Sequence, residues 1–245
     1  MNSSNATVNG SKSLQALSSS RVVEGVFKIL YLLRTGRLGL LLSIPLYRCW
    51  WRLRGLDFGI VSIQELGLRP DRANYHKDGG GPLLRDLLNR MKITESDAVL
   101  DLGSGKGGAM ATLARYPFKA VDGVEISPEL VEVARKNLSK LGLQQCHLFL
   151  ADAAAFTALD EYTYIFMFNP FPEVVLQQVL SNLEESLRRK PRQVRLVYSN
   201  PLHERTILAS GTFTKTFTYQ PYMNYLICVY ENKNFSFELR SETHR

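Results

Sequence analysis

Two hydrophobic patterns alternate from Pro82 towards the C-terminus. Short runs that are mostly apolar, typical of buried strands, occupy residues 98–102, 120–126, 146–151, 162–168 and 193–199. Between them, apolar residues recur every three or four positions, as on one face of a helix, at residues 107–116, 129–141 and 174–187. Strands joined by helical crossovers of this length form a parallel sheet with right-handed connections.

The last two predicted strands are connected differently. Residues 212–219 and 225–230 are separated only by residues 220–224, a connection too short to hold a helix. We therefore expect an antiparallel hairpin. The predicted fold class is α/β, with a doubly wound, mostly parallel seven-stranded sheet, a C-terminal antiparallel hairpin and an N-terminal helical segment.

The patterns divide the chain into three parts. Residues 1–20 are rich in Ser and Asn and lack apolar periodicity, so we predict a disordered tail. Residues 21–73 are predicted to form a basic amphipathic helical segment, because apolar residues recur at helical spacing in its first half. Residues 74–245 are predicted to form the main α/β domain.

The positive charge is unevenly distributed. Residues 1–60 carry +6 of the net charge of +7. A solvated face or tail explains this better than a nucleic-acid surface, so nucleic-acid binding is not expected. Trp50 and Trp51 stand beside arginines after an apolar run, which suits peripheral membrane contact through residues 21–54. The other interpretation is that this segment covers a flank of the main domain. Neither of its apolar runs is long enough to span a bilayer.

The cysteines bear on metal binding and on the compartment. Cys49, Cys146 and Cys228 are scattered without metal-ligand spacing, so neither a metal site nor a disulfide framework is expected. The cytoplasm or another reducing compartment fits this usage, with membrane association as an addition. A transit peptide remains open as well, because no acidic residue precedes Glu24.

A glycine-rich loop follows the strand predicted at residues 98–102. The strand end and the loop contain, in order, Asp101, Gly103, Ser104, Gly105, Lys106 and Gly107. Glycines here allow a tight turn and the close approach of a ligand. The Asp101 carboxylate would repel a pyrophosphate, but it can accept a hydrogen bond from the ammonium of an amino-acid ligand. The loop therefore favours S-adenosylmethionine (SAM) over a dinucleotide.

Two more acidic residues stand at the ends of the next two strands. Glu125, followed by Ile126, can accept hydrogen bonds from both hydroxyls of a ribose. Asp152 can accept from the amino group of adenine, and Ala153 leaves room for the ring. Three acids at consecutive strand ends predict a single cofactor site.

The stretch from residue 99 to residue 171 resembles the class I SAM-dependent methyltransferase family. The resemblance implies that Asp101, Gly103 and Gly105 contact the methionine part of SAM, Glu125 the ribose and Asp152 the adenine. The DLGSGKG loop with the NPF motif is similar to a group of poorly characterised methyltransferases, and the loop also resembles that of certain histone-lysine enzymes.

Asn169, Pro170 and Phe171 follow the fourth predicted strand and are the candidate catalytic residues. In family members that methylate planar amines, an Asn or Asp, two prolines and an aromatic residue orient the amine. This sequence has one proline before Phe171, which shifts the aromatic ring by one residue. The alternative is that Asn169 and Pro170 only end the strand and cap the next helix.

The resemblance implies a SAM-dependent methyltransferase, with a protein side chain, lysine, as the favoured acceptor. A small-molecule or lipid acceptor is the alternative, favoured if the N-terminal segment forms a substrate pocket. A SAM-binding module without catalysis is a further alternative. Tyr75 and residues 78–82 are expected to form a flap over the cofactor or a linker, and His76, His147 and His203 to lie on surfaces or in turns.

Overall fold

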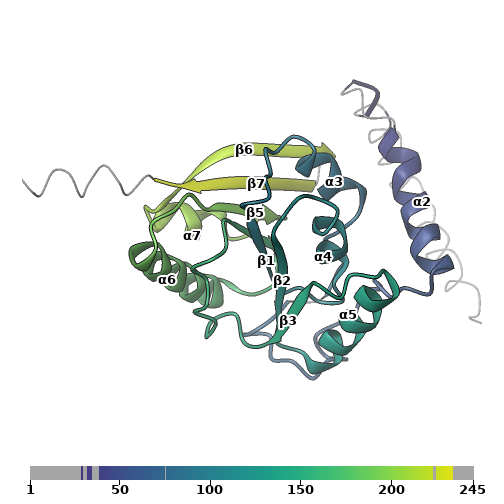
Figure 1. Cartoon of the computed structure of the whole chain (residues 1–245), viewed down its shortest axis with the longest axis horizontal. Helices are drawn as coiled ribbons and strands as arrows, with labels where there is room; N and C mark the ends of the chain where they lie inside the picture. The colour runs from purple at the N-terminus through teal and green to yellow at the C-terminus, as the bar shows by residue number, and fades with distance from the viewer. Residues whose placement is uncertain (1–28, 30–31, 35–38, 75, 223–224, 234–245) are drawn as a thin grey trace, which may run out of the picture.

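The computed structural model describes residues 29, 32–34, 39–74, 76–222 and 225–233 (Figure 1). The tail predicted at residues 1–20 and the flap residue Tyr75 lie outside these residues. So does most of the helical pattern at residues 21–33.

The seven strands of the described chain form one sheet in the order β3-β2-β1-β4-β5-β7-β6. Its members are β1 (Ala98–Leu102), β2 (Ala120–Glu125), β3 (His147–Leu150), β4 (Tyr164–Phe168), β5 (Arg195–Ser199), β6 (Phe213–Tyr222) and β7 (Tyr225–Asn232). β1 to β5 pair in parallel, and β7 pairs antiparallel with both β5 and β6. The predicted fold class is confirmed.

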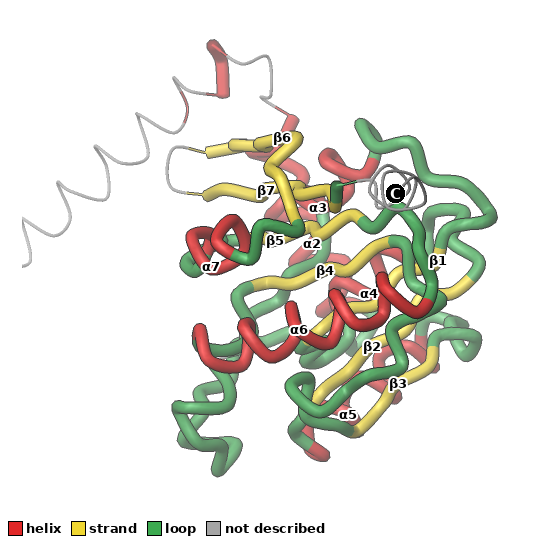
Figure 2. Tube along the Cα trace, turned by 90° about the vertical axis from the view of Figure 1, so that its left-hand side faces the viewer, coloured by secondary structure: helices red, strands yellow, loops and turns green. Residues whose placement is uncertain are grey.

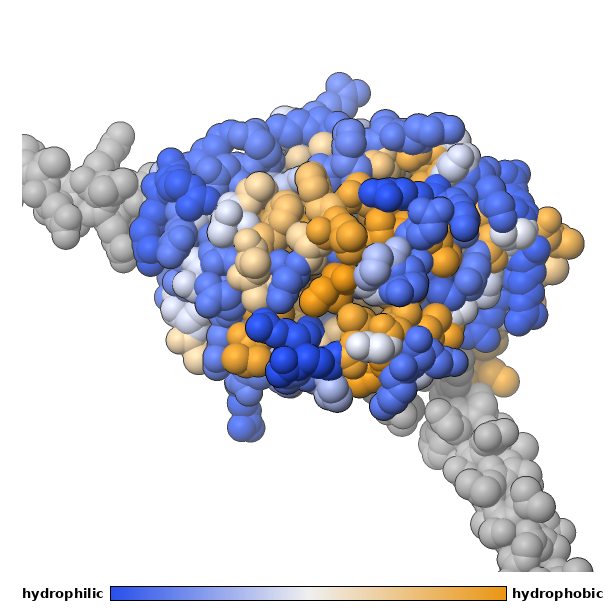
Figure 3. Space-filling view, turned by 90° about the horizontal axis from the view of Figure 1, so that it is seen from below, coloured by the Kyte–Doolittle hydropathy of each residue, from blue (hydrophilic) through white to orange (hydrophobic). Residues whose placement is uncertain are grey.

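Helices cover both faces of this sheet (Figure 2). Buried residues of α3 (Pro82–Leu88), α4 (Gly108–Leu113) and α5 (Pro128–Lys140) form the core on one face. The core on the other face is formed by α6 (Glu173–Arg189) and α7 (Glu204–Ala209). Successive residues of a buried strand contribute to opposite cores: in β1, Val99 belongs to the first core and Leu100 to the second. The surface is not uniformly polar, because apolar residues gather in the middle of the face seen in Figure 3.

The helix α2 (Gly39–Leu53) stands at the side of the molecule, next to α3 (Figure 1). Pro45 lies inside it, on the exposed side. The opposite side packs on the domain: Leu40 is buried, and the Tyr47 hydroxyl donates to Asp78 Oδ2 at 3.2 Å. Part of the basic segment therefore covers a flank of the main domain. Within the described residues no helix has the length and apolarity that crossing a membrane requires.

The hairpin and two helices differ from the predictions. The sequence predicts a connection at residues 220–224, whereas β6 continues to Tyr222. Pro221 is tolerated there because β6 is an edge strand, and the register shifts between Tyr219 and Tyr222. The helices α3 and α7 were not predicted, because seven and six residues are too few to show a clear helical period.

Candidate functional site

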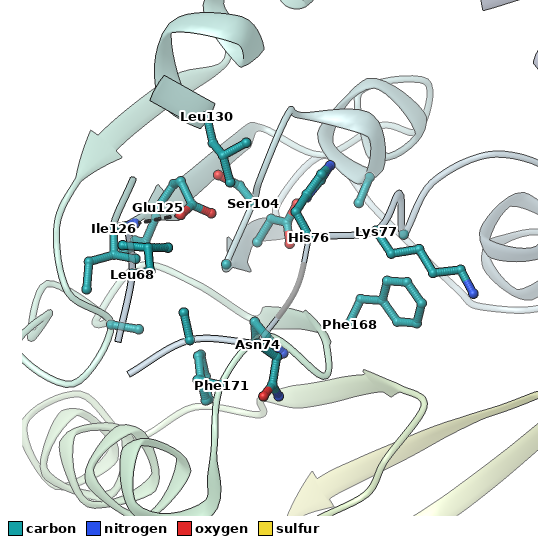
Figure 4. Close-up of a pocket in the computed structure, with 18 of the residues that line it drawn as sticks. Leu68, Asn74, His76, Lys77, Ser104, Glu125, Ile126, Leu130, Phe168 and Phe171 are labelled. Carbon is teal, nitrogen blue, oxygen red and sulfur yellow. Dashed lines mark hydrogen bonds between the residues drawn. The ribbon is translucent and has the colours of Figure 1, made fainter. Parts of the chain in front are cut away.

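A pocket lies at the carboxyl ends of β1, β2 and β4. The strand order reverses here, because β2 and β3 lie on one side of β1 and β4 and β5 on the other. Open α/β sheets bind ligands at such a switch point. Of the predicted site residues, those that line it are Asp101, Gly103, Ser104, Glu125, Ile126, Asp152, Ala153, Pro170 and Phe171. Figure 4 shows Glu125 and Ile126 at one end of the pocket and Lys77 and Phe168 at the other.

Asp101, the residue before the last of β1, lies in this pocket and is only 2% exposed. Its Oδ2 atom is buried and has no hydrogen-bond partner among the described residues, and the same holds for Ser104 Oγ. Burial, together with the charges of Glu125 and Asp78, raises the pKa of Asp101 well above its ordinary value. An unpaired buried carboxyl is costly, so this position calls for a donor or a cation from a ligand.

Glu125 ends the strand β2 and holds the glycine-rich loop. Its Oε2 accepts from the amide of Gly105 at 2.8 Å, and its Oε1 accepts from the amides of Ile126 and Ser127, each at 2.9 Å. Burial raises the pKa of Glu125, and these amides oppose the shift. A carboxylate has about four acceptor positions, so the three bonds leave capacity for a ligand hydroxyl.

The other three predicted residues of the loop lie outside the pocket. Gly105, Lys106 and Gly107 do not line the pocket. Lys106 is buried, and its Nζ donates to both carboxylate oxygens of Asp57 at 2.8 Å. Although burial opposes it, the Lys106 ammonium lowers the pKa of Asp57. Lys106 thus anchors the loop to the segment after α2, and its predicted contact with the cofactor stays a prediction.

The predicted adenine acid, Asp152, lies at the edge of the pocket. Its Oδ1 accepts from the amide of Ala154 at 2.9 Å, and its Oδ2 lies 3.3 Å from Arg72 Nη1. Ala153 lies between them and lines the pocket. The acid is thus placed by its own turn and partly neutralised by Arg72, which comes from the segment that precedes β1.

That preceding segment covers the pocket and was largely missed by the sequence analysis. Its lining residues are Leu66, Leu68, Arg72, Ala73, Asn74, His76, Lys77, Asp78 and Gly79. Asn74 fixes it to the end of β4: its Nδ2 donates to the carbonyl of Asn169 at 3.0 Å, and its amide donates to the carbonyl of Pro170 at 2.9 Å. No periodicity or motif marks these residues; only Asp78 and Gly79 fall in the predicted flap at residues 78–82.

His76 lies in this cover, and the prediction that it is a surface or turn residue is wrong. A Cβ atom on Gly105 would meet His76 Nδ1 at 2.2 Å, so the ring packs directly on the loop. Its Nε2 is buried without a partner among the described residues. Burial and the nearby Lys106 charge lower the pKa of His76 to about 4. His147, in contrast, is exposed as predicted.

Asp78 brings a fourth carboxyl to the pocket, after Asp101, Glu125 and Asp152. Its Oδ1 accepts from the amide of Gly80 at 2.8 Å, and its Oδ2 accepts from the Tyr47 hydroxyl at 3.2 Å. Burial raises the pKa of Asp78 to about 6, and these donors oppose the shift. With Asp101 and Glu125, the pocket gathers three carboxyls whose protonated forms are favoured by burial.

The three candidate catalytic residues differ in whether they face the pocket. Pro170 and Phe171 line the pocket, but the Asn169 side chain does not: its Oδ1 accepts from the Tyr198 hydroxyl at 3.2 Å. Asn169 has a positive φ of 41°, which ends β4 and turns the chain. It does not cap the next helix, because α6 begins after Pro172 without a side-chain cap.

A second pocket adjoins the first. Lys77, Asp78 and Phe168 line both. The inner side of α2 forms one wall, and the aromatic residues of this second pocket are Tyr47, Trp51, Phe58, Phe168 and Tyr225. Its basic residues are Arg48, Arg52 and Lys77. We call this second pocket the α2 pocket.

The first pocket fits SAM, which carries a positive sulfonium and an ammonium on its amino-acid part. Asp101, whose Oδ2 lacks a partner among the described residues, and three further acids complement that charge. Only glycine fits at position 103, because its φ is +75° and a Cβ would lie 2.2 Å from Pro170 Cβ, so the loop packs closely against Pro170 at the pocket.

Comparisons with known proteins agree with this fit. Residues 99–190 match a family model described as a methyltransferase domain. A protein-L-isoaspartate O-methyltransferase of Pyrococcus abyssi is 34% identical over 68 residues, which are 28% of this chain and 32% of that protein. A trans-aconitate 2-methyltransferase of Azoarcus sp. is 32% identical over 100 residues, 40% of each chain. The chain thus spans less than half the length of these relatives.

Among solved structures, an MtNAS variant in complex with S-adenosylmethionine shares the fold. The TM-score is 0.50 at 18% identity, over 61% of this chain and 60% of that chain. Taken with the carboxylate-lined pocket at the switch point, the family match identifies the domain: residues 99–190 belong to a class I SAM-dependent methyltransferase domain.

Proposed function

We propose that the protein transfers the methyl group of SAM to an acceptor held in the α2 pocket. The observation that carries this proposal is the buried Asp101 carboxyl, whose Oδ2 has no partner among the described residues, in a pocket that shares three lining residues with a second, aromatic pocket. The relatives are methyltransferases by name, which supports the same reaction.

The residues of the first pocket divide the task of holding SAM. Asp101 would accept from the ammonium, Glu125 from the ribose and Asp152 from the adenine amino group, since all three line the pocket. When bound, SAM supplies an activated methyl group on a positive sulfur. The protein then has to align an acceptor with that methyl and exclude water, which is the kind of catalysis that positioning alone can provide.

Asp78 is placed to take the proton that the acceptor loses. In the transfer, the acceptor's lone pair would form the new bond to the methyl carbon as the sulfur–methyl bond breaks, and S-adenosylhomocysteine would leave. The proton passes from the acceptor nitrogen or oxygen to a carboxylate oxygen of Asp78, which lines both pockets. Its pKa of about 6 lets it be ionised at neutral pH and still hold a proton transiently.

The charges of the α2 pocket bear on the acceptor class. Arg48, Arg52 and Lys77 outnumber its single acid, Asp78. They attract a negative group and repel a lysine ammonium, while the aromatic walls take an apolar body. A small molecule or lipid that combines an apolar part with a negative charge is therefore the acceptor that these contacts support best.

A protein lysine, which the sequence analysis favours, is the second candidate. A flexible chain that ends in an amine would fit between aromatic rings, and Lys77 Nζ already lies 5.8 Å from the centre of the Phe168 ring. Relatives named as methyltransferases of ribosomal protein L11 and of release-factor glutamine favour protein acceptors in general. The engagement of Asn169 with Tyr198 removes the expected amine-orienting amide.

A substrate screen tests this proposal. SAM with a labelled methyl group is incubated with the full chain and with separate lipid, small-molecule, protein and RNA fractions. We expect label in the lipid or small-molecule fraction, and loss of it with Trp51→Ala, which opens the α2 pocket. Val174→Ala, at an exposed position outside both pockets, is the control. Label confined to the protein fraction would contradict a small-molecule or lipid acceptor and support a protein lysine. SAM binding without methyl transfer to any fraction would contradict catalysis.

A further inference from the structure

The helix α2 has two apolar faces, and only one of them is used by the domain. The inner face carries Leu40, Ile44, Tyr47 and Trp51, which are buried or half-buried. Leu42, Leu46, Cys49 and Leu53 follow the same spacing of four, three and four residues on the opposite side. A helix that is apolar on two opposite sides has a second surface to cover.

The outer face of α2, defined by Leu42, Leu46, Cys49 and Leu53, is strongly exposed. The leucines are 70%, 66% and 82% exposed, in that order. Ile60, which follows the helix, is 69% exposed. Exposed leucines that are aligned along a helix differ from the scattered apolar residues found on any protein surface.

Arginines flank this outer face on both sides. Arg48 and Arg52 are exposed and, at helical spacing, lie between the outer face and the rim of the α2 pocket. On the other side, the Arg54 guanidinium lies 5.4 Å from the centre of the Trp50 ring. An apolar stripe between cations, with an indole at its border, has the chemistry of a helix that lies in the interface of an anionic bilayer.

We propose that the outer face of α2 docks the protein on an anionic lipid bilayer, with α2 parallel to the surface. The leucines enter the boundary between headgroups and acyl chains, and the three arginines contact lipid phosphates. The charge favours this occupant over a second copy of the chain, because two such faces would place like charges against each other. Docking also brings the rim of the α2 pocket to the headgroups, so that an amphiphilic acceptor can enter from the membrane.

Co-sedimentation of the full chain with vesicles tests this proposal. We expect binding to vesicles that contain phosphatidylglycerol, little binding to pure phosphatidylcholine, and release as salt rises from about 50 mM to about 500 mM. The variant L42Q/L46Q/L53Q should lower partition by at least ~tenfold, since each leucine contributes through its buried apolar area. The control L202Q/V174Q removes two apolar residues elsewhere, which are 67% and 61% exposed, and should bind as the wild type does.

A second variant keeps the test independent of the apolar change. Replacing Arg48 and Arg52 by Gln should lower partition about 25-fold, because each arginine near an anionic surface is worth about fivefold. SAM binding by the leucine variant, measured in parallel, shows that the domain is folded. Equal partition of the wild type and both variants would overturn the proposal. So would a concentration-dependent dimer that the leucine variant abolishes while no form binds vesicles, because α2 would then cover a second copy.

Discussion

The first pocket, which we call the cofactor pocket, shares three residues with the α2 pocket, but the two are held together by different interactions. The cofactor pocket is fixed by hydrogen bonds: Glu125 accepts three amides, and Asn137 Nδ2 donates to the carbonyls of Asp57 and Lys106. The α2 pocket is fixed mainly by packing, with the Tyr47–Asp78 contact as its polar link. Loops held by hydrogen bonds keep the cofactor site in one geometry. The aromatic side chains on α2 can be substituted without breaking those hydrogen bonds.

The largest effect that separates the two pockets should come from the loop. We expect Gly103→Ala to lower the free energy of unfolding by about 3 kcal/mol or more, because it adds backbone strain and a clash with Pro170. Gly142→Ala is the matched control: its φ is +72° and nothing lies within 4 Å of its Cβ position, so it should cost only about 1 kcal/mol from strain. Urea unfolding measures both. Equal losses would mean that Pro170 does not press on the loop.

Asp101→Asn should affect binding and stability in opposite directions. We expect SAM affinity to fall by about 1.5–3 kcal/mol, the usual worth of a hydrogen bond to a charged group. The free energy of unfolding should stay the same or rise, because the change removes a buried carboxyl beside Glu125 and Asp78. Calorimetry and thermal unfolding measure the two effects. Glu125→Gln is the contrast and should destabilise the protein, because Glu125 serves three loop amides. A large stability loss in Asp101→Asn would show that the carboxyl is structural.

The dependence of SAM binding on pH should follow the acids of the cofactor pocket. The pKa of Asp78 is raised from 3.8 to about 6, so the folded chain holds this proton to higher pH than the unfolded chain does. Its ionisation therefore lowers stability as pH rises through that interval, and a bound cation offsets the loss. We expect SAM affinity to fall as pH drops below about 6, in a titration of affinity against pH. Affinity that is constant across this range would contradict ionised acids as the binding groups.

The smallest effect should come from the α2 side. Tyr47→Phe removes a hydroxyl that donates to Asp78 Oδ2 and lowers the pKa of that acid. We expect unfolding to become easier by about 1 kcal/mol and the pH midpoint of SAM binding to move upward, with little change in affinity above that midpoint. Urea unfolding and the same pH titration check this. A large loss of SAM affinity at high pH would show that the two pockets are not separable.

The sequence predicted the cofactor pocket better than the α2 pocket for a physical reason. Asp101, Glu125 and Asp152 stand at or just after strand ends, and parallel strands bring such ends to one edge of the sheet. Their positions in the sequence therefore predict that they lie close together. The cover formed by residues 66–74 and 76–79 has no repeating pattern, and its place is set by bonds such as that from Asn74 Nδ2 to the Asn169 carbonyl. The orientation of Asn169 towards Tyr198 also depends on a residue of the next strand, β5, which no local motif encodes.

The most direct test of the account is the binding of SAM to two variants measured side by side. Calorimetric titrations at about pH 8 would compare the wild type, Asp101→Asn in the cofactor pocket and Trp51→Ala in the α2 pocket, with S-adenosylhomocysteine as competitor. We predict one SAM per wild-type chain, an affinity lower by about tenfold or more in Asp101→Asn, and unchanged affinity in Trp51→Ala. No heat with the wild type, or equal losses in both variants, would contradict a SAM pocket built on Asp101 and independent of the α2 pocket.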